Sequence, residues 1–328
     1  LIIMKFGILG SGSWGTALAK ILTDNGNNIY WWNRSAEAIE IFKQRHINPQ
    51  YLSSAKFKMD HLQLTTEPQE VIQHADIIVV AIPSAFTAGA LQKLPPRIFE
   101  NKKIVSAIKG ILPEHNLLLN DYLKDQFSFS ITDYFAVLGP CHAEEVAKEK
   151  LSYLTFSGLD ESMARDIAAC FKTNYMNTVV NKDIFGVQYA AVLKNIYAVG
   201  AGIAHGLDYG DNFLSVLIAN SADEMAGFLR KAGIINAEVG YNDSEKLKTS
   251  AHHNYAASVY LGDLLVTCYS LYSRNRSFGN MIGKGYSVKA AQLEMNMVAE
   301  GYNASRCMYE INKQIGARMP IASAIYDI

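Results

Sequence analysis

The sequence contains little cysteine and shows no excess of charge of either sign. Only four of its 328 residues are cysteine, and these are widely scattered, without a Cys-x-x-Cys pair. That usage predicts reduced thiols rather than a disulfide framework. Thirty lysines and arginines stand against 31 acidic residues, which gives a net charge of −1. The chain therefore has no general electrostatic attraction to nucleic acid or to an anionic membrane.

Long apolar runs are missing as well. No uninterrupted apolar stretch reaches the length of a membrane span, and the opening Leu-Ile-Ile-Met is too short for a signal peptide. We therefore expect a soluble, cytoplasmic protein. The length suits two domains, or one large one, and is ample for a buried core. Because the sequence stops in the middle of a pattern at Ile325–Ile328, we expect a short C-terminal piece beyond it.

A glycine-rich segment stands near the N-terminus, Gly10-Ser11-Gly12-Ser13-Trp14-Gly15. A short apolar run, residues 6–9, comes directly before it, and a helical pattern follows directly after it. In a dinucleotide site the first glycine permits a tight turn, and the second lets backbone approach a pyrophosphate. The third allows close packing of helix on strand. A structural turn is the alternative for a lone GxGxxG, but this context favours a nicotinamide or flavin cofactor.

The rest of the chain falls into two parts of different pattern. Up to about residue 180, strand-like runs alternate with helical patterns, as in a parallel sheet built from βαβ units. From residue 185 onward the strand signals stop. We predict an α/β fold with a Rossmann-type, doubly wound, mostly parallel sheet in residues 1–183, which binds a dinucleotide. An all-α, substrate-binding domain is expected in residues 184–328.

The individual elements are expected as follows. Strands cover residues 6–9, 28–32, 76–82, 103–108 and 134–138, with 153–157 and 176–180 as later additions to the sheet. Helical patterns follow Gly15, Ser35, Pro68, Ser84, Glu114, His142 and Glu161. In the second part they cover residues 185–204, 212–232, 255–269, 287–299 and 302–315.

The end of the second expected strand bears on the choice of cofactor. Sites selective for NAD usually place an Asp or Glu about 20 residues past the glycine loop, where it holds the ribose 2′-hydroxyl. Here the strand ends in Asn33-Arg34, without an acid. The Arg34 guanidinium can bind a 2′-phosphate through charged hydrogen bonds, can stack on adenine, or is simply exposed to solvent. The missing acid predicts a preference for NADP(H), with NAD(H) as the second option.

Two further loops follow expected strands, at the edge where open α/β sheets bind ligands. Lys109 is expected to face the cofactor crevice, although an ordinary surface lysine is the alternative. His142 stands close to Glu144 and Glu145 in another of these loops. No second histidine or cysteine lies at ligand spacing, so we expect no metal. The two carboxylates are better explained as partners of a helix dipole.

An unusual lysine lies in the helical half. Residues 188–199 are almost entirely apolar except for Lys194 and Asn195, so this helix lacks the polar stripe of a surface helix. A lysine held in such surroundings has a lowered pKa, in the range useful for proton transfer. A lysine that extends to solvent at the helix edge fits the same pattern. The helix alone does not decide between the two.

Two later segments favour the proton-transfer interpretation. Asp263 precedes an apolar helical run, where its carboxylate can orient an ammonium group. Residues 273–280 then set two arginines, an asparagine and two hydroxyls between glycine-bounded turns. Such a loop suits a phosphate or carboxylate on a small substrate, and a solvated basic loop is the alternative. Together these features indicate proton transfer on a phosphorylated hydroxy or keto compound.

Eight segments of the chain match the motifs of one enzyme family. They are Gly10-x-Gly12-x-x-Gly15-Thr16-Ala17-Leu18-Ala19, Lys109-Gly110, Gly139-Pro140-x-x-Ala143-x-Glu145, Lys194-Asn195-Ile196, Gly210-Asp211-Asn212, Leu261-Gly262-Asp263-Leu264, Ser273-Arg274-Asn275-Arg276 and Glu300-Gly301. In these motifs the chain resembles the NAD(P)-dependent glycerol-3-phosphate dehydrogenases, over nearly its whole length. The combination is specific, because dehydrogenases that share only the glycine loop would lack the last four.

The resemblance implies roles for particular residues. Lys194 would accept the proton when the substrate hydroxyl is oxidised and return it in the reverse reaction, with Asp263 orienting it. The residues implied to line the substrate are Lys109, Gly139, Cys141, Lys194, Asp263, Ser273, Arg274 and Asn275. Those implied to meet the nicotinamide dinucleotide are Gly10, Gly12, Ser13, Trp14, Gly15, Arg34, Tyr51, Lys109, Ala143, Arg274, Val298 and Glu300.

The resemblance also implies an activity, the interconversion of dihydroxyacetone phosphate and glycerol 3-phosphate, which supplies phospholipid synthesis. A dehydrogenase of β-hydroxyacids such as 6-phosphogluconate is a second enzyme that keeps the same architecture. A non-catalytic dinucleotide sensor is the alternative from another class. The expected partners are small molecules, and a homodimer is a candidate because helical second domains of this kind often dimerise.

The chain departs from the family pattern at three places. Cys141 stands where the family usually has Ser or Thr, which weakens the hydroxyl contact expected there. Ala219-Asn220 replaces a Thr-Arg pair, and Ala299 interrupts what is often Val-Val-Glu-Gly. None of these changes touches Lys194.

Overall fold

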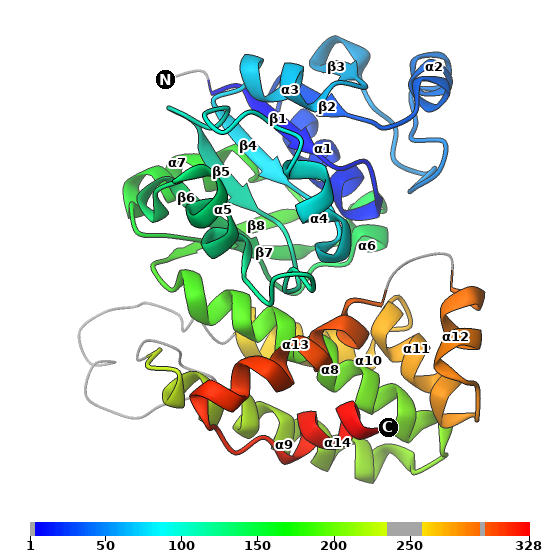
Figure 1. Ribbon diagram of the computed structural model, residues 1–328. Helices are drawn as coiled ribbons and strands as arrows, with labels where there is room; N and C mark the ends of the chain where they lie inside the picture. The colour runs from blue at the N-terminus through cyan, green and yellow to red at the C-terminus, as the bar shows by residue number, and fades with distance from the viewer. Residues whose placement is uncertain (1–3, 235–257, 296–298) are drawn as a thin grey trace, which may run out of the picture. The chain divides into compact units, whose positions relative to one another are not determined.

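The computed structural model describes residues 4–234, 258–295 and 299–328, and its chain forms two compact units (Figure 1). The sheet unit comprises Leu1–Ile82, Phe86–Ile108 and Leu119–Ile184. The helical unit comprises Pro83–Ala85, Lys109–Leu118 and Phe185–Ile328. Within the described ranges, no helix combines the length and the apolar character that crossing a membrane requires.

The sheet unit is built on eight strands in the order β3-β2-β1-β4-β5-β6-β7-β8. All neighbouring pairs are parallel except β6 and β7. The order reverses between β1 and β4, which is where open α/β sheets bind ligands beyond the carboxyl ends of the strands. The predicted Rossmann-type sheet is confirmed. The strands are β1 (Phe6–Leu9), β2 (Ile29–Trp32), β3 (Leu62–Thr65), β4 (Ile77–Val80), β5 (Lys103–Ser106), β6 (Tyr134–Leu138), β7 (Ser152–Gly158) and β8 (Met176–Asn181).

Helices cover both faces of this sheet. Successive strand residues point to opposite faces, and all four residues of β4 are buried, so both faces must be covered. Phe6 and Ile8 belong to a core shared with α1 and α2. Gly7, between them, faces α3 on the opposite side, since a Cβ added to it would lie 2.7 Å from Val71. The helices are α1 (Ser13–Asp24), α2 (Ala36–Arg45), α3 (Pro68–His74), α4 (Ser84–Leu91), α5 (Leu119–Phe127), α6 (Ala143–Ala147) and α7 (Glu161–Cys170).

Two predictions for this unit were wrong. Strand β3 was not expected, since it is only four residues long, LQLT, and its alternation of apolar and polar residues is short. It is an edge strand that pairs with β2 alone. The helix predicted after Glu114 begins only at Leu119, because residues 112–117 first form a turn closed by a bridge between Leu112 and Leu117.

The described part of the helical unit contains helices and no strand, as predicted. Its elements are α8 (Ile184–Gly206), α9 (Gly210–Lys231), a π-helical turn η4 (Ser258–Gly262), α10 (Asp263–Tyr269), α11 (Arg274–Gly283), α12 (Val288–Glu294), α13 (Glu300–Ile315) and α14 (Pro320–Asp327). Helix α14 was not expected. Helix α12 ends at Glu294 rather than at residue 299, and residues 255–257 of the expected helix lie outside the described residues.

The segment predicted as an anion-binding loop is helix α11. Ser273 caps its N-terminus by accepting a hydrogen bond from Arg276 N at 3.3 Å. A Cβ at Gly279 would lie 2.0 Å from the Val199 carbonyl oxygen, and one at Gly202 would lie 2.1 Å from the Arg276 carbonyl oxygen. Two helices therefore pack backbone to backbone at glycines. Gly279, which suggested a turn in the sequence, therefore allows α11 to approach α8 closely instead.

Candidate active site

The glycine loop of the sheet unit is built so that side chains cannot replace its first and third glycines. Gly10 has a φ of +122°, and a Cβ there would lie 2.6 Å from the Ala81 carbonyl oxygen, beyond β4. A Cβ at Gly15 would lie 2.1 Å from the Gly10 carbonyl oxygen. At Gly12, by contrast, no atom lies within 4 Å of the added Cβ. The middle glycine thus leaves open space beside the backbone, which suits a close-lying pyrophosphate.

Two side chains hold this loop in place. Trp31 donates a hydrogen bond from Nε1 to the Gly10 carbonyl oxygen at 2.9 Å. Asn48 donates from Nδ2 to the Ser11 carbonyl oxygen at 3.0 Å and to Thr16 Oγ1 at 2.8 Å. No side chain caps Gly12 at the start of α1, which leaves the helix N-terminus suited to an anion. Sequence reasoning missed Trp31 and Asn48, because neither belongs to the motif.

The residues that follow β2 lie at the same sheet edge as the glycine loop. β1 and β2 are parallel, and Leu9 pairs with Trp32. Asn33 is buried and holds the turn, with Oδ1 accepting from Ser35 N at 3.4 Å. Arg34 is exposed, and its guanidinium forms no hydrogen bond or ion pair with the residues that the structure describes. A cation without an acidic partner therefore stands where the ribose of a dinucleotide is held in this fold.

The remaining predicted residues of the sheet unit are mostly backbone or buried positions. Tyr51 donates from its backbone N to Asn48 Oδ1 at 3.2 Å, which ties it to the glycine loop. Gly139 follows β6 with a φ of +144°, and a Cβ there would lie 2.7 Å from the Tyr153 carbonyl oxygen. Cys141 is buried, and Ala143 is the first residue of α6. The described residues contain no group of three or more His, Cys, Asp or Glu that could hold a metal ion.

A buried ion pair joins α8 to α10 in the helical unit. Lys194 Nζ contacts Asp263 Oδ1, and the two side chains are 3% and 2% exposed. The alternative of a lysine that reaches solvent is therefore wrong. Asp263 begins α10 directly after the π-helical turn η4, and its carbonyl oxygen accepts a hydrogen bond from Thr267 Oγ1 at 2.5 Å. Single π-helical turns are frequent at functional sites because they re-aim the residues beside them.

Burial sets the protonation behaviour of this pair. Loss of water around Lys194 is the largest effect and lowers its pKa; the negative charge of Asp263 opposes it, the positive charge of Lys109 adds to it, and the pKa lies at about 8. Burial raises the pKa of the neighbouring Cys268 to about 12, so this side chain stays a thiol. Asp263 Oδ2 is buried and has no hydrogen-bond partner among the described residues. The pair thus provides a lysine with a pKa of about 8 and a carboxylate oxygen, Asp263 Oδ2, that can accept a hydrogen bond from a ligand.

Lys109 is held next to this pair by Asn195. Asn195 donates from Nδ2 to the Lys109 carbonyl oxygen at 2.8 Å, and it directly follows Lys194 in α8. A Cβ at Gly301 would lie 2.4 Å from the Asn195 carbonyl oxygen, so the start of α13 also packs closely here. Sequence reasoning noted Asn195 only as part of a motif, and the motif carries no signal for the partner, which lies 86 residues away.

The start of α11 and the start of α13 come together at the same place. Asn275 Oδ1 accepts a hydrogen bond from Gly301 N at 2.9 Å, while its amide NH2 donates to no described residue. Glu300 accepts from Ser84 N at 3.0 Å and from Ser84 Oγ, and the charge of Arg274 acts on it. Burial raises the pKa of Glu300. Ser84 was not predicted as a site residue, and Val298, which was, lies outside the described residues.

Models of one protein family match both parts of the chain. The model for the N-terminus of NAD-dependent glycerol-3-phosphate dehydrogenase matches residues 5–164, and the model for its C-terminus matches residues 183–328. The chain belongs to this family. The predicted resemblance is confirmed, and the chain is an NAD(P)-dependent oxidoreductase of the glycerol-3-phosphate dehydrogenase family.

Relatives of known name agree with this membership, and a solved structure shares the fold. The glycerol-3-phosphate dehydrogenase (NAD(P)+) of Bacillus subtilis is 34% identical over 325 residues, which cover 99% of this chain and 89% of the relative. The enzyme of the same name from Streptococcus equi is 34% identical, with 98% and 90% covered. The crystal structure of glycerol-3-phosphate dehydrogenase from Coxiella burnetii shares the fold with a TM-score of 0.85 at 24% identity, covering 98% of this chain and 93% of that one.

Proposed function

We propose that Lys194 is the proton donor and acceptor in the interconversion of dihydroxyacetone phosphate and glycerol 3-phosphate. The observation that carries this proposal is the buried Lys194–Asp263 pair, with Lys109 beside it. A general acid or base works best when its pKa lies near the operating pH, and Lys194, at about 8, meets that requirement. In cells we expect reduction, which supplies glycerol 3-phosphate for phospholipid synthesis.

The chemistry divides between hydride and proton. The nicotinamide, when bound, accepts or supplies the hydride at substrate C2. Lys194 Nζ takes the proton of the C2 hydroxyl during oxidation and returns it during reduction. Asp263 Oδ1 fixes the position of the ammonium group, and its free Oδ2 can accept a further hydrogen bond from the substrate. Lys109 adds a second positive charge, which stabilises negative charge that develops on the substrate oxygen.

We assign recognition of the substrate phosphate to the start of α11. Arg274 presents a guanidinium, whose planar donors pair with a phosphate in two parallel hydrogen bonds. Asn275 keeps its amide NH2 available while Oδ1 holds Gly301. Ser273 accepts one hydrogen bond from Arg276 N through its hydroxyl oxygen, and its hydroxyl proton can still be donated to a ligand. The sheet unit, with its glycine loop, would hold the dinucleotide.

Comparison of related substrates tests this function. Purified protein with NADPH should oxidise the cofactor when dihydroxyacetone phosphate is added, and the loss of reduced-nicotinamide absorbance measures the rate. Unphosphorylated dihydroxyacetone is the matched control and should react far more slowly, because it leaves Arg274 without an anion. A dinucleotide sensor would show no substrate-dependent change. Faster oxidation of 6-phosphogluconate with NADP+ than of glycerol 3-phosphate would favour the β-hydroxyacid dehydrogenase instead.

We further propose that NADPH is preferred over NADH. The support is the exposed, unpaired Arg34 at the end of β2 and the absence of an acid there. A charged hydrogen bond contributes about 1.5–3 kcal/mol, which corresponds to roughly tenfold to a hundredfold in selectivity. The double substitution Asn33→Asp/Arg34→Ala should reverse the preference, because it adds a ribose-binding acid and deletes the cation.

The measurement is kcat/KM for both cofactors in the parent enzyme and in the double variant. Arg97→Ala, which removes another exposed arginine of the sheet unit, serves as the control and should leave the ratio unchanged. A parent that prefers NADH, or a double variant with an unchanged ratio, would show that Arg34 does not recognise the 2′-phosphate.

A further inference from the structure

A cavity lies in the sheet unit, at the far end of α1 from the glycine loop. Its volume is about 720 Å³, within the range of about 300–1,000 Å³ that small-molecule sites occupy. It shares no lining residue with the glycine loop or with the Lys194–Asp263 pair. Helix α1 has 12 residues, which at 1.5 Å per residue separate its two ends by roughly 18 Å. This cavity is therefore distinct from the dinucleotide site.

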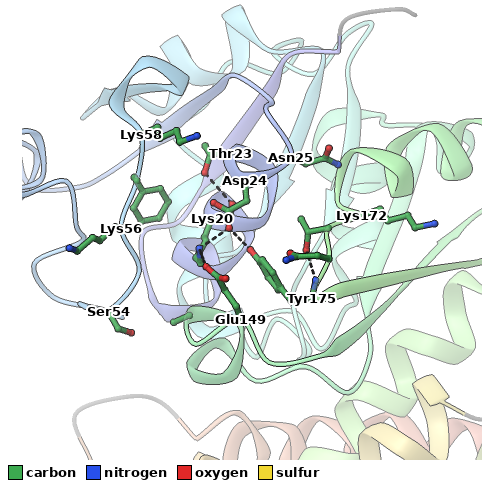
Figure 2. A pocket seen from close by; sticks show the side chains of 14 residues that line it. Lys20, Thr23, Asp24, Asn25, Ser54, Lys56, Lys58, Glu149, Lys172 and Tyr175 are labelled. Carbon is green, nitrogen blue, oxygen red and sulfur yellow. Dashed lines mark hydrogen bonds and ion pairs between the residues drawn. The ribbon is translucent and has the colours of Figure 1, made fainter.

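A charged cluster forms the floor of this cavity (Figure 2). Lys20 is buried and forms ion pairs with Asp24 Oδ2 at 2.7 Å and with Glu149 Oε1 at 3.0 Å. The Tyr175 hydroxyl donates to the same Asp24 oxygen at 2.6 Å. Burial by itself lowers the pKa of Lys20, but the hydrogen bonds and charges of the two carboxylates outweigh it and raise the pKa. Lys20 therefore remains protonated at neutral pH.

Both carboxylate oxygens and ammonium groups around the cavity remain available to a ligand. Asp24 Oδ1 and Glu149 Oε2 accept no hydrogen bond from the described residues. Three exposed lysines also line the cavity, and none of them forms an ion pair in the described part of the chain: Lys56, Lys58 and Lys172. Figure 2 shows Lys56 and Lys58 on one side of the cavity and Lys172 with Tyr175 on the other. Four lysines thus meet two carboxylates, which leaves an excess of positive charge.

This combination selects a particular ligand chemistry. Unpaired ammonium groups attract a phosphate as point charges. Carboxylate oxygens accept hydrogen bonds from sugar hydroxyls, as the acid of a dinucleotide site does from ribose. A ligand with a phosphate at one end and neighbouring hydroxyls at the other would use both sets of groups. An apolar ligand would bury the charges of the floor without compensation, which is unfavourable.

We propose that the cavity at the end of α1 binds a phosphorylated sugar, either free or as part of a nucleotide. Its phosphate lies on Lys56 and Lys58, on one side of the cavity, and its hydroxyls donate to the free oxygens of Asp24 and Glu149. The segment that carries Lys56 and Lys58 also carries Asn48, which holds the glycine loop. The bound sugar phosphate therefore contacts the C-terminal end of α1, whose N-terminal end carries the glycine loop. It also contacts the segment after α2 that holds this loop through Asn48.

Calorimetric titration of the whole protein tests this proposal. Ribose 5-phosphate and adenosine monophosphate are the two probes, and both are titrated with NADPH at saturation so that the dinucleotide site is filled. The first variant, Lys56→Met/Lys58→Met, removes two exposed cations of the cavity. Its matched control, Lys93→Met/Lys124→Met, removes two exposed lysines of the same unit that do not line it. A third variant, Glu149→Gln, removes one acceptor carboxylate and retains the shape of the side chain.

We expect at least one probe to bind with a single saturable site. Its affinity should fall about tenfold or more in Lys56→Met/Lys58→Met, the loss expected for a charged hydrogen bond, and should be unchanged in the control pair. Inorganic phosphate is titrated as a third ligand, which has no sugar hydroxyls. Glu149→Gln should lower the affinity for the sugar phosphate but leave the affinity for inorganic phosphate unchanged. Binding of both probes identifies the sugar phosphate as the recognised part, and binding of adenosine monophosphate alone identifies a nucleotide. Absence of saturable binding, or equal losses in the two double variants, would overturn the proposal.

Discussion

Replacement of Lys194 by methionine should lower turnover by roughly 10²–10⁴, the usual contribution of a positioned acid–base group. Methionine matches the apolar surroundings of α8 but has no amine, so the group proposed to exchange the hydroxyl proton is removed. Because the glycine loop lies in the sheet unit, affinity for NADPH should stay close to that of the parent. Steady-state kinetics with dihydroxyacetone phosphate and a separate fluorescence titration of NADPH measure the two effects.

A second substitution at the same position separates chemistry from structure. Lys194→Arg keeps a positive charge beside Asp263, but a guanidinium does not release its proton near neutral pH. It should therefore lose turnover as the methionine variant does, while the ion pair persists. Lys103→Met serves as the control, since it also removes an ion-paired lysine, 2.8 Å from Asp133, and should keep its activity. Turnover close to that of the parent in Lys194→Arg would rule out Lys194 as the proton acceptor.

Those parts of the structure that depend on local pattern could be predicted from the sequence. The first and third glycines of the loop were predictable because each answers a steric demand: Gly15 packs against the Gly10 carbonyl oxygen in the same βα unit, and Gly10 packs against the Ala81 carbonyl oxygen beyond β4. The apolar helix around Lys194 was compatible with burial but did not decide it; Asp263 and the polar residues 273–280 favoured the buried lysine. The carboxylate partner could be suspected, since a buried ammonium group needs one.

Other features depend on tertiary contacts that leave no local trace. Helix α11 looked like a loop, because glycine lowers helix propensity, but Gly279 and Gly202 let two backbones pack directly against each other. The bond from Asn195 to the Lys109 carbonyl oxygen joins segments 86 residues apart. Strand β3 gains its place by pairing with β2 rather than from its own sequence. In each case a partner distant in sequence determines the local structure, which propensity cannot anticipate.

The substitution Asp263→Asn should shift the pH dependence of the reaction as well as its rate. In the parent, with the pKa of Lys194 at about 8, oxidation of glycerol 3-phosphate should rise with pH through 8, as the lysine loses its proton. Reduction requires the protonated lysine and should fall over the same range. Asp263 raises the pKa of Lys194, so its neutral replacement should lower that pKa further.

Both pH profiles of Asp263→Asn should therefore move toward lower pH. Each unit by which the pKa of Lys194 falls below the working pH removes about tenfold of the protonated lysine, so reduction at neutral pH should suffer more than oxidation. Removal of one partner of a buried ion pair commonly costs about 3–5 kcal/mol of stability because the other charge is left uncompensated. Lys194 can avoid much of that cost by releasing its proton. Thermal unfolding and the pH profiles of kcat in both directions are the measurements. If Asp263 served only to pack α10 against α8, kcat would change without any movement of the pH profiles, and its role in setting the protonation of Lys194 would be excluded.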